Sequence, residues 1–501
     1  MDTAGSNATP PPGDPRRWRV LALLAGLQFM LVLDITVVNV ALPSVAQSLG
    51  FSQSGLAWVV NGYVLMAGGL LLLGGRLADV FGRRRLLLLG AGLFAAASAV
   101  CGAAQAPWML VAGRFVQGLG EAFAAPAALG LIALLFVDPR ERTKALGIWG
   151  GLTGLGGTLG FVMSGVLTDA VSWRWIFYVN VPVAVLILVV APRIVTDDRK
   201  PRPKEGRLDF TGAVTATAGL VAIVYGLLQA AARPWGATEV LLPVIAGACL
   251  LGVTVVVELK SRNPLIPLRF FADRTRTTIN IATLGFMAAF VSYTFLLTLF
   301  EQQVLGYSPL RTGLLYLPLG VAIGAGIALC TTLMPRFGVR AMASAGYLGA
   351  GIGLLLTSMI DADSGYGRIL PGMLVFGLFA GITMPAGATA ALHQVTERDS
   401  SLASGVQSTM QQVGSALGLA CLVTLALRHA GGRMRENVLP SIATTEGYAL
   451  SFRIGAALLV AGGLSVMLMM ERVVPSASDP IAASAVAGNQ SDVAAPGRRD
   501  G

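Results

Sequence analysis

The sequence predicts an all-α polytopic membrane protein made of two six-helix bundles and two linking spans, with fourteen transmembrane helices. Of its 501 residues 54% are hydrophobic and 12% are charged, which is too little charge for the surface of a soluble protein of this length. A helix needs about 20 mostly apolar residues to cross a bilayer, and runs of that length recur along the chain. Lys and Arg cluster between these runs, as in membrane proteins, so the net charge of +10 does not indicate a nucleic-acid partner.

Fourteen apolar runs are long enough to span. The first is too long for a signal peptide and is followed by many others, so we expect it to be retained. In an alternative topology with twelve spans, 210–258 lies on the membrane. We disfavour it because both runs in that stretch are long enough to cross. The expected spans are 19–43, 55–77, 86–106, 107–134, 145–169, 174–192, 210–230, 240–258, 278–302, 311–333, 341–360, 369–391, 404–427 and 450–470.

The most charged loop, RIVTDDRKPRPKEGR at 193–207, marks the break between the two bundles. The polar, Pro-rich beginning and the end rich in Ala, Ser, Gly and Asp are expected to be tails, the second of them disordered. The expected organisation is a cytoplasmic tail at 1–18, a six-helix bundle at 19–192, a linker with two extra spans at 193–277, a second six-helix bundle at 278–470 and a cytoplasmic tail at 471–501.

The distribution of Lys and Arg predicts the orientation. With the N-terminus inside, 27 of the 36 lie in inner segments and 8 in outer loops, and Arg114 lies within a span. This bias predicts that both termini are cytoplasmic. Arg outnumbers Lys, and Ala and Gly are abundant, as in proteins from GC-rich bacterial genomes. We therefore expect a multi-pass protein of a bacterial inner membrane.

The sequence lacks the residues that disulfide bonding, metal binding, ATP binding and catalysis would need. The four Cys lie in apolar segments without paired spacing and the two His are far apart, so neither a disulfide framework nor a metal site is expected. None of the four Lys follows a Gly, so there is no phosphate-binding loop for ATP. No Ser/His/Asp set suggests an enzyme. We expect no cofactor, and the remaining energy source is an ion gradient.

The two halves carry a similar loop at the same place. The chain reads GRLADVFGRRR at 75–85, after the second span, and LMPRFGVR at 333–340, after the tenth. The pairs Phe81-Gly82 and Phe337-Gly338 correspond. Internal duplication of this kind is typical of transporters with the substrate site between the repeats.

Five stretches resemble one family. The loop at 75–85, LDITVVNVALP at 33–43, RFVQGLG at 114–120, WRWIFYVNVP at 173–182 and PLIPLRFF at 264–271 are similar to motifs of the major facilitator superfamily, specifically its fourteen-span drug:proton antiporters of the EmrB/QacA type. The resemblance covers about 18–470. It implies the major facilitator fold, alternating access, and proton-coupled export of lipophilic, cationic or natural-product molecules such as drugs and antibiotics.

The span 5 motif departs from the family pattern. A Gly-Pro pair followed by Gly-Gly is usual there, whereas this chain has Phe161 in place of the Pro and keeps Gly156, Gly160 and Gly165. The surrounding glycines, from Gly147 onward, still permit close helix packing. The missing Pro bears on how tightly export is coupled.

Three ionisable residues within spans need an explanation, because an ionised side chain in a span costs about 2.5–3.5 kcal/mol on insertion scales. Asp34 and Arg114 are about 13 Å and 10 Å from the outer ends of their spans at 1.5 Å per residue, so they could meet. Asp34 is then a proton carrier or half of a fixed structural ion pair. Glu121 is two turns from Arg114 on the same helical face, and it is a second proton site, a site for a cationic substrate, or a protonated structural carboxyl.

Other polar residues are weaker candidates. Glu301 is followed by Gln302 and Gln303 at the outer end of span 9, where an interfacial position is the default and contact with departing substrate the alternative. The residues Gly75, Asp79, Gly82, Arg83 and Arg84 are expected to form a cytoplasmic gate motif. The candidates for lining the substrate cavity, for which hydrogen bonding between helices is the alternative role, are Asn39, Asn61, Tyr63, Gln117, Tyr225 and Gln411.

Three functions stay open at this point. The first is proton-coupled export by alternating access, with small-molecule substrate, protons and lipid as partners and a monomer expected. The second is a proton-coupled uptake symporter for a nutrient, which the altered span 5 motif favours and the span 1 motif and fourteen-span plan oppose. The third is a non-transporting receptor or scaffold, for which the soluble domain is missing.

Overall fold

The computed structural model describes residues 16–136, 138–195, 209–261, 268–395 and 400–471. Fourteen helices in these ranges are long and apolar enough to cross a membrane. This number and the all-α class confirm the sequence prediction. The first half contains α1 (Arg16–Leu49), α2 (Gln53–Phe81), α3 (Arg83–Gly102), α4 (Pro107–Leu135), α5 (Pro139–Ala170), the short α6 (Trp175–Tyr178) and α7 (Asn180–Ile194).

Two linking helices follow, and then the second half. The linking helices are α8 (Phe210–Gln229) and α9 (Thr238–Lys260). The second half contains η1 (Leu268–Ala272), α10 (Arg274–Leu299), the π-helical η2 (Phe300–Val304), α11 (Pro309–Leu315), α12 (Leu317–Phe337), α13 (Val339–Thr357), α14 (Tyr366–Ala391), α15 (Ser400–Arg435) and α16 (Pro440–Met469).

Local chemistry sets many helix ends. Ser52, Asp209, Asp273 and Ser308 cap α2, α8, α10 and α11, each accepting a hydrogen bond from a backbone N–H of the first turn. Proline occupies the first turn of α4, α11, α12 and α16, where its missing N–H costs nothing.

The corresponding loops of the two halves have the same backbone geometry. Gly82 ends α2 with φ 96°, and Gly338 ends α12 with φ 81°. A side chain is rarely tolerated at positive φ, so glycine is required at both positions. The preceding Phe81 and Phe337 are 54% and 57% exposed. This geometry confirms the internal repeat that the sequence predicts.

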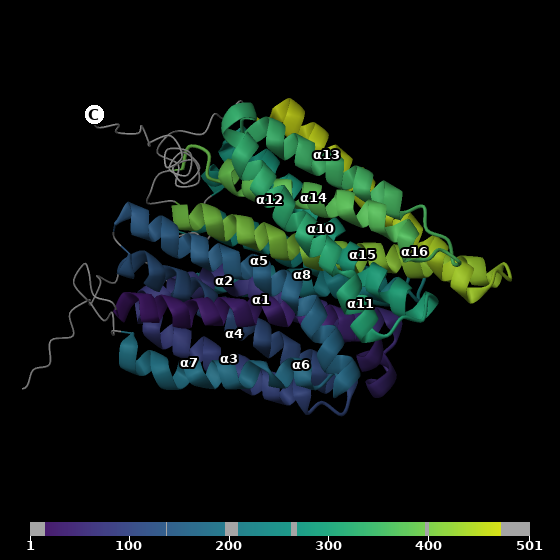
Figure 1. Cartoon of the computed structure of the whole chain (residues 1–501), viewed down its shortest axis with the longest axis horizontal. Helices are drawn as coiled ribbons and strands as arrows, with labels where there is room; N and C mark the ends of the chain where they lie inside the picture. The colour runs from purple at the N-terminus through teal and green to yellow at the C-terminus, as the bar shows by residue number, and fades with distance from the viewer. Residues whose placement is uncertain (1–15, 137, 196–208, 262–267, 396–399, 472–501) are drawn as a thin grey trace, which may run out of the picture.

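The halves form separate layers (Figure 1), α1–α7 in purple to blue and α10–α16 in green to yellow. We call the end of the molecule where α1 begins and α16 ends the terminal end, and the opposite end the distal end. The α8–α9 hairpin lies beside both layers: a Cβ on Gly69 of α2 would meet Thr217, and Thr424 of α15 donates a hydrogen bond to the Leu227 carbonyl, 2.8 Å.

The largest differences from the predicted boundaries lie between the last two spans. Helix α15 continues to Arg435 and α16 begins at Pro440, so most of the expected loop between 427 and 450 is helical. This polar extension protrudes at the distal end (Figure 1). Arg433 bridges the two helices through a 2.6 Å ion pair with Glu446 and also pairs with Glu436. Apolar length alone does not reveal such an extension because its residues are polar.

Helix α5 meets the second half only toward the distal end. A Cβ on Gly165 would lie 2.6 Å from the Pro309 carbonyl oxygen, Phe161 stacks on Tyr316 at 4.4 Å between ring centroids, and a Cβ on Gly320 of α12 would meet Thr158. Further toward the terminal end, α5 and α12 no longer contact each other at the glycine positions. For each of Gly147, Gly150, Gly151, Gly154 and Gly324, a Cβ would meet no atom of the described residues within 4 Å.

The prediction that the span 5 glycines permit close packing is therefore correct for one face only. Gly156 and Gly160 lie against α1, where added Cβ atoms would approach Val32 at 3.3 Å and crowd into Thr36. The glycines from Gly147 to Gly154 are exposed on the other face. The two halves still touch through α2 and α15, because a Cβ on Gly405 of α15 would lie 2.4 Å from the Leu72 side chain of α2.

Candidate functional site

A buried ion pair joins α1 and α4. Nη1 of Arg114 lies 2.5 Å from Oδ2 of Asp34, and the side chains are 1% and 0% exposed. Gln117 donates to the other carboxylate oxygen, Oδ1, at 3.2 Å, and Asn180 donates to the same oxygen at 2.7 Å. Three donors therefore surround Asp34, as expected around a carboxylate, which accepts hydrogen bonds and donates none.

The surrounding residues hold this arrangement in place. Nε of Arg114 donates to the Val59 carbonyl at 2.8 Å, and Nη1 donates to Oε1 of Gln117 at 3.0 Å. The Gln117 amide donates to Ser98 at 2.8 Å, so its oxygen and nitrogen both have partners. The network thus links α1, α2, α3, α4 and α7, and it lies within the first half of the chain.

Sequence reasoning missed two members of the network, Asn180 and Ser98. Asn180 is the first residue of α7 and lies in the stretch at 173–182 that resembles the family, so a signal was present. Nothing in the pattern around Ser98 singles it out. Of the predicted cavity residues, Gln117 instead belongs to the buried network.

Tyr63 and Glu121 lie next to the ion pair. The Arg114 guanidinium carbon is 4.2 Å from the centroid of the Tyr63 ring. Glu121 interacts electrostatically with Tyr63, Asp34 and Arg114. It is partly exposed, while its Oε2 and the Tyr63 hydroxyl are buried, and the two side chains interact with each other. The three ionisable residues singled out from the sequence thus form one electrostatic group.

Among the other predicted cavity residues, Asn39 and Asn61 are buried. Asn39 donates to Ile35 of its own helix, and neither polar atom of the Asn61 side chain has a partner within the described ranges. Gln411 lines a small crevice inside the second half, with Gln407, Thr283 and Tyr347.

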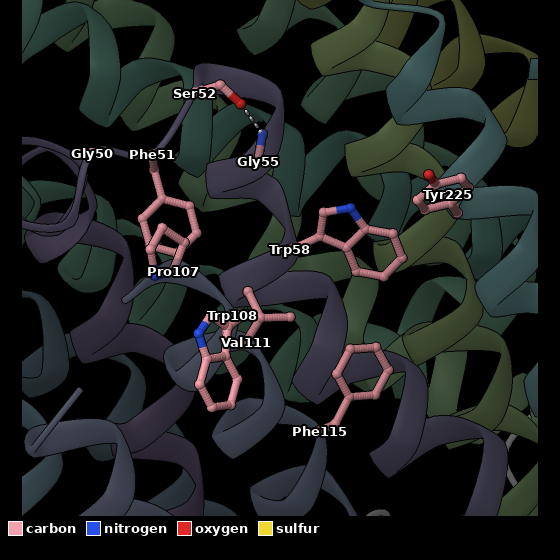
Figure 2. A pocket seen from close by; sticks show the side chains of 10 residues that line it. All are labelled: Gly50, Phe51, Ser52, Gly55, Trp58, Pro107, Trp108, Val111, Phe115 and Tyr225. Carbon is pink, nitrogen blue, oxygen red and sulfur yellow. Dashed lines mark hydrogen bonds between the residues drawn. The ribbon is translucent and has the colours of Figure 1, made fainter. Parts of the chain in front are cut away.

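Tyr225 lies in an aromatic pocket with residues of α2 and α4 (Figure 2). The pocket has a volume of about 580 Å³. Trp58, Trp108 and Phe115 come from α2 and α4, and the Tyr225 ring lies 6.3 Å from that of Trp58. No ionisable group other than Tyr225 lines it. Tyr225 is on α8, one of the two linking helices, and it stays a candidate for lining a cavity.

The predicted gate motif lies at the terminal end, where α2, α3, α4 and α7 meet. Arg83 pairs with Asp79 at 2.9 Å and donates to the Gly130 carbonyl at 3.2 Å, and Arg84 donates to the Pro192 carbonyl at 2.6 Å. Gly82 supplies the turn, and a Cβ on Gly75 would make only ordinary contact, 3.6 Å from Pro126. These contacts all join parts of the first half.

Glu301 lies in η2, at the distal end of its span, and its side chain is buried, 0% exposed. Gln302, by contrast, donates across to the Val40 carbonyl of α1 at 2.8 Å.

Fourteen spanning helices in two layered halves, with a buried ion pair and no strand in the described ranges, define a polytopic membrane transporter. A family model described as the Major Facilitator Superfamily matches residues 24–419. The chain belongs to this superfamily and is a transporter rather than an enzyme.

Comparisons with individual proteins agree. The chain is 37% identical over 462 residues to the puromycin resistance protein pur8 of Streptomyces alboniger, covering 89% of this chain and 90% of that one. It is 38% identical over 424 residues to the lincomycin resistance protein of Streptomyces lincolnensis, covering 83% and 86%. Its fold resembles that of a bacterial homologue of the lysosomal transporter Spinster, solved in an inward-facing, occupied conformation, with a TM-score of 0.63, 19% identity and coverage of 91% and 97%.

Proposed function

We propose that this transporter is a proton-coupled antiporter that exports lipophilic small molecules, antibiotics among them, across the inner membrane of a bacterium. The observation that carries the proposal is the buried Asp34–Arg114 pair with Glu121 beside it. A carboxylate inside a membrane protein is costly and marks an ion pathway or proton relay by default.

The orientation follows from the Lys and Arg bias, with both termini in the cytoplasm. The terminal end is then the cytoplasmic end. The halves separate there between α5 and α12 and meet at the distal end, so the structure corresponds to an inward-facing state. Substrate enters from the cytoplasm or the inner leaflet between the two halves.

In the inward-facing state three donors surround the Asp34 carboxylate, an arrangement that favours release of its proton. Glu121, which is partly exposed, is the group through which that proton leaves toward the cytoplasm. After the halves rock, protonation of Asp34 from outside breaks its pairing with Arg114. The freed guanidinium reorganises the network around Gln117, and this change lowers the affinity for substrate and favours its release.

The substrate class rests on the relatives and on the surfaces that face the opening. The relatives' names associate them with puromycin and lincomycin. The α5 face between Gly147 and Gly154 is exposed and lacks charged side chains, which suits bulky molecules of varied shape. Glu121 supplies a carboxyl group that can bind amine-containing substrates.

The proposal is tested with the purified protein in proteoliposomes whose interior is acidic. In the protein molecules whose cytoplasmic side faces outward, added drug enters as a cytoplasmic substrate and protons leave the liposome in exchange. Addition of puromycin or lincomycin is expected to dissipate the gradient. Liposomes containing the Asp34→Asn variant serve as the control and should keep it. A gradient that survives both drugs with the unchanged protein argues against proton-coupled export of these compounds.

A further inference from the structure

The distal ends of the two halves are joined by the π-helical segment η2. Gln302 donates to the Val40 carbonyl of α1 at 2.8 Å, and Gln53 at the start of α2 donates to Gln303 at 3.2 Å. We call these two hydrogen bonds, together with the Phe161–Tyr316 stack, the distal gate. Single π-helical turns are rare and are frequently found at functional sites.

Glu301 directly precedes Gln302 and Gln303 in the sequence, and its side chain is buried. Its side chain is 0% exposed, and neither carboxyl oxygen has a hydrogen-bond partner in the part of the chain that the structure describes. Nor does any cationic side chain of that part lie within salt-bridge distance of it. Asp34, by comparison, has three donors. The two buried carboxyl groups therefore have opposite environments.

The groups around Glu301 are tyrosines rather than cations. Tyr293 of α10, Tyr316 at the start of α12 and Tyr366 of α14 interact with it electrostatically. The Tyr316 hydroxyl donates to the Thr294 carbonyl and the Tyr366 hydroxyl to the Leu315 carbonyl, so both protons are used elsewhere.

The charged residues on the other elements packed against η2 have other partners or positions. Arg311 of α11 lies over the Tyr307 ring, 3.8 Å from its centroid. On α16, Glu446 pairs with Arg433, Tyr448 is buried, and Arg453 is exposed. None of these residues neutralises Glu301.

An ionised carboxylate without donors or a cation is very costly to bury, whereas the neutral acid costs far less. We propose that Glu301 is a proton-binding site of the distal gate: it binds a proton from the distal side before the gate closes and returns it to that side when the gate opens. The proton moves from distal water to a carboxyl oxygen and back, so no bond other than O–H is made or broken.

The position of Glu301 explains how its charge would reach the gate. It is adjacent in sequence to Gln302, and its neighbour Tyr316 forms the stack with Phe161 of α5. Ionisation of Glu301 in the closed state would place a charge without a partner next to the Gln302 hydrogen bond and the Phe161–Tyr316 stack. Opening of the gate admits water, which stabilises the charge. Acid on the distal side therefore favours the closed gate.

This inference deepens the proposed function and rests on it only in assuming that the halves rock. For an exporter driven by protons, closure of the distal gate in acid returns the empty protein to the state that accepts cytoplasmic substrate. The role of Glu301 is separate from that of Asp34, because its proton is returned to the side from which it came.

The test measures the distance between nitroxide labels on the two halves in lipid nanodiscs without substrate, at pH 5.5 and pH 8.5. The labels replace Val171 and Leu439, which are 62% and 64% exposed, and the native cysteines are replaced by serine. The otherwise unchanged protein should favour the short distance at pH 5.5 and shift toward the long one at pH 8.5, by about tenfold in population ratio per pH unit at most for one proton. Glu301→Gln should keep the short distance at both values.

Matched variants show which carboxyl group causes the change in distance with pH. Glu239→Gln removes an exposed acid that pairs with Arg233 and should leave the response unchanged. Asp34→Asn should retain it too, even if the variant no longer transports. A pH response that survives Glu301→Gln, or that Asp34→Asn alone abolishes, overturns the proposal. Glu301→Leu is a second neutral variant. Because the closed state is proposed to hold a neutral side chain, failure of both variants to fold would also overturn it.

Discussion

Arg114 of α4 and Asp34 of α1 form an ion pair of 2.5 Å in the interior of the first half, with both side chains almost completely removed from solvent. Such a pair is expensive to bury and costly to break, because the remaining charge is left without its partner. We propose that its role in the spanning bundle is a cycle in which the pair opens and closes.

Replacement of Asp34 by Asn should therefore lower both stability and transport. Arg114 keeps its hydrogen bonds to Val59 and Gln117 but loses the negative charge, so we expect a loss on the order of 3 kcal/mol in the free energy of unfolding. Thermal unfolding in detergent measures this. Asp169→Asn, at an exposed position on α5, is the control and should behave as the unchanged protein. Equal stability of the two variants would contradict the claim that the Asp34–Arg114 pair stabilises the folded protein.

Asn180 is expected to act as a positioning residue for Asp34. Its hydrogen bond of 2.7 Å ends on a charged oxygen, and the loss of such a bond typically costs about 1.5–3 kcal/mol. Asn180→Leu should lower the melting temperature and slow drug efflux, measured at equal amounts of protein in the membrane. In the Asp34→Asn background the same change should have a smaller effect on stability. Additive effects of the two substitutions would show that the residues act independently.

Two glycines of α5 provide a matched pair for the packing of this helix. A Cβ on Gly160 would overlap the Thr36 side chain, so Gly160→Ala should destabilise by about 1–3 kcal/mol. Gly154 faces open space, and alanine there should be neutral or stabilise by about 0.5–1 kcal/mol through helix propensity. Thermal unfolding of the two variants compares them directly. The reverse order would mean that α5 presents its other face to α1.

The Phe161–Tyr316 stack should help to keep the distal gate closed. Aromatic pairs contribute about 0.5–1.5 kcal/mol beyond their buried area, so Phe161→Ala should raise the open population about two- to tenfold. The readout is the rate at which an impermeant thiol reagent modifies Gln302→Cys from outside cells. Phe290→Ala removes a stack with Phe376 that lies within the second half and is the control. If both changes raise the rate equally, the effect is general loosening.

The sequence predicts the fourteen spans because apolar length is a strong and local signal. It also singles out Asp34 and Arg114, since charges in spans are rare, and the turn at Gly82 and Gly338, since the two halves repeat it. The partners Asn180 and Ser98 were not predicted as site residues because a single polar residue in an apolar run does not reveal which helix it faces. Glu301 is buried in the π-helical turn η2, and the pattern of apolar residues in the sequence does not predict such a turn. Which face of α5 is open depends on the conformational state, and one sequence encodes more than one such state.

The most direct test of the account is efflux of a fluorescent lipophilic cation from energised cells, with and without a protonophore, compared between the unchanged protein and Asp34→Asn at equal membrane expression. The account predicts rapid efflux by the unchanged protein, its arrest by the protonophore, and no efflux by the variant. Undiminished efflux in the presence of the protonophore, or by Asp34→Asn, would contradict the claim that protons drive export through Asp34.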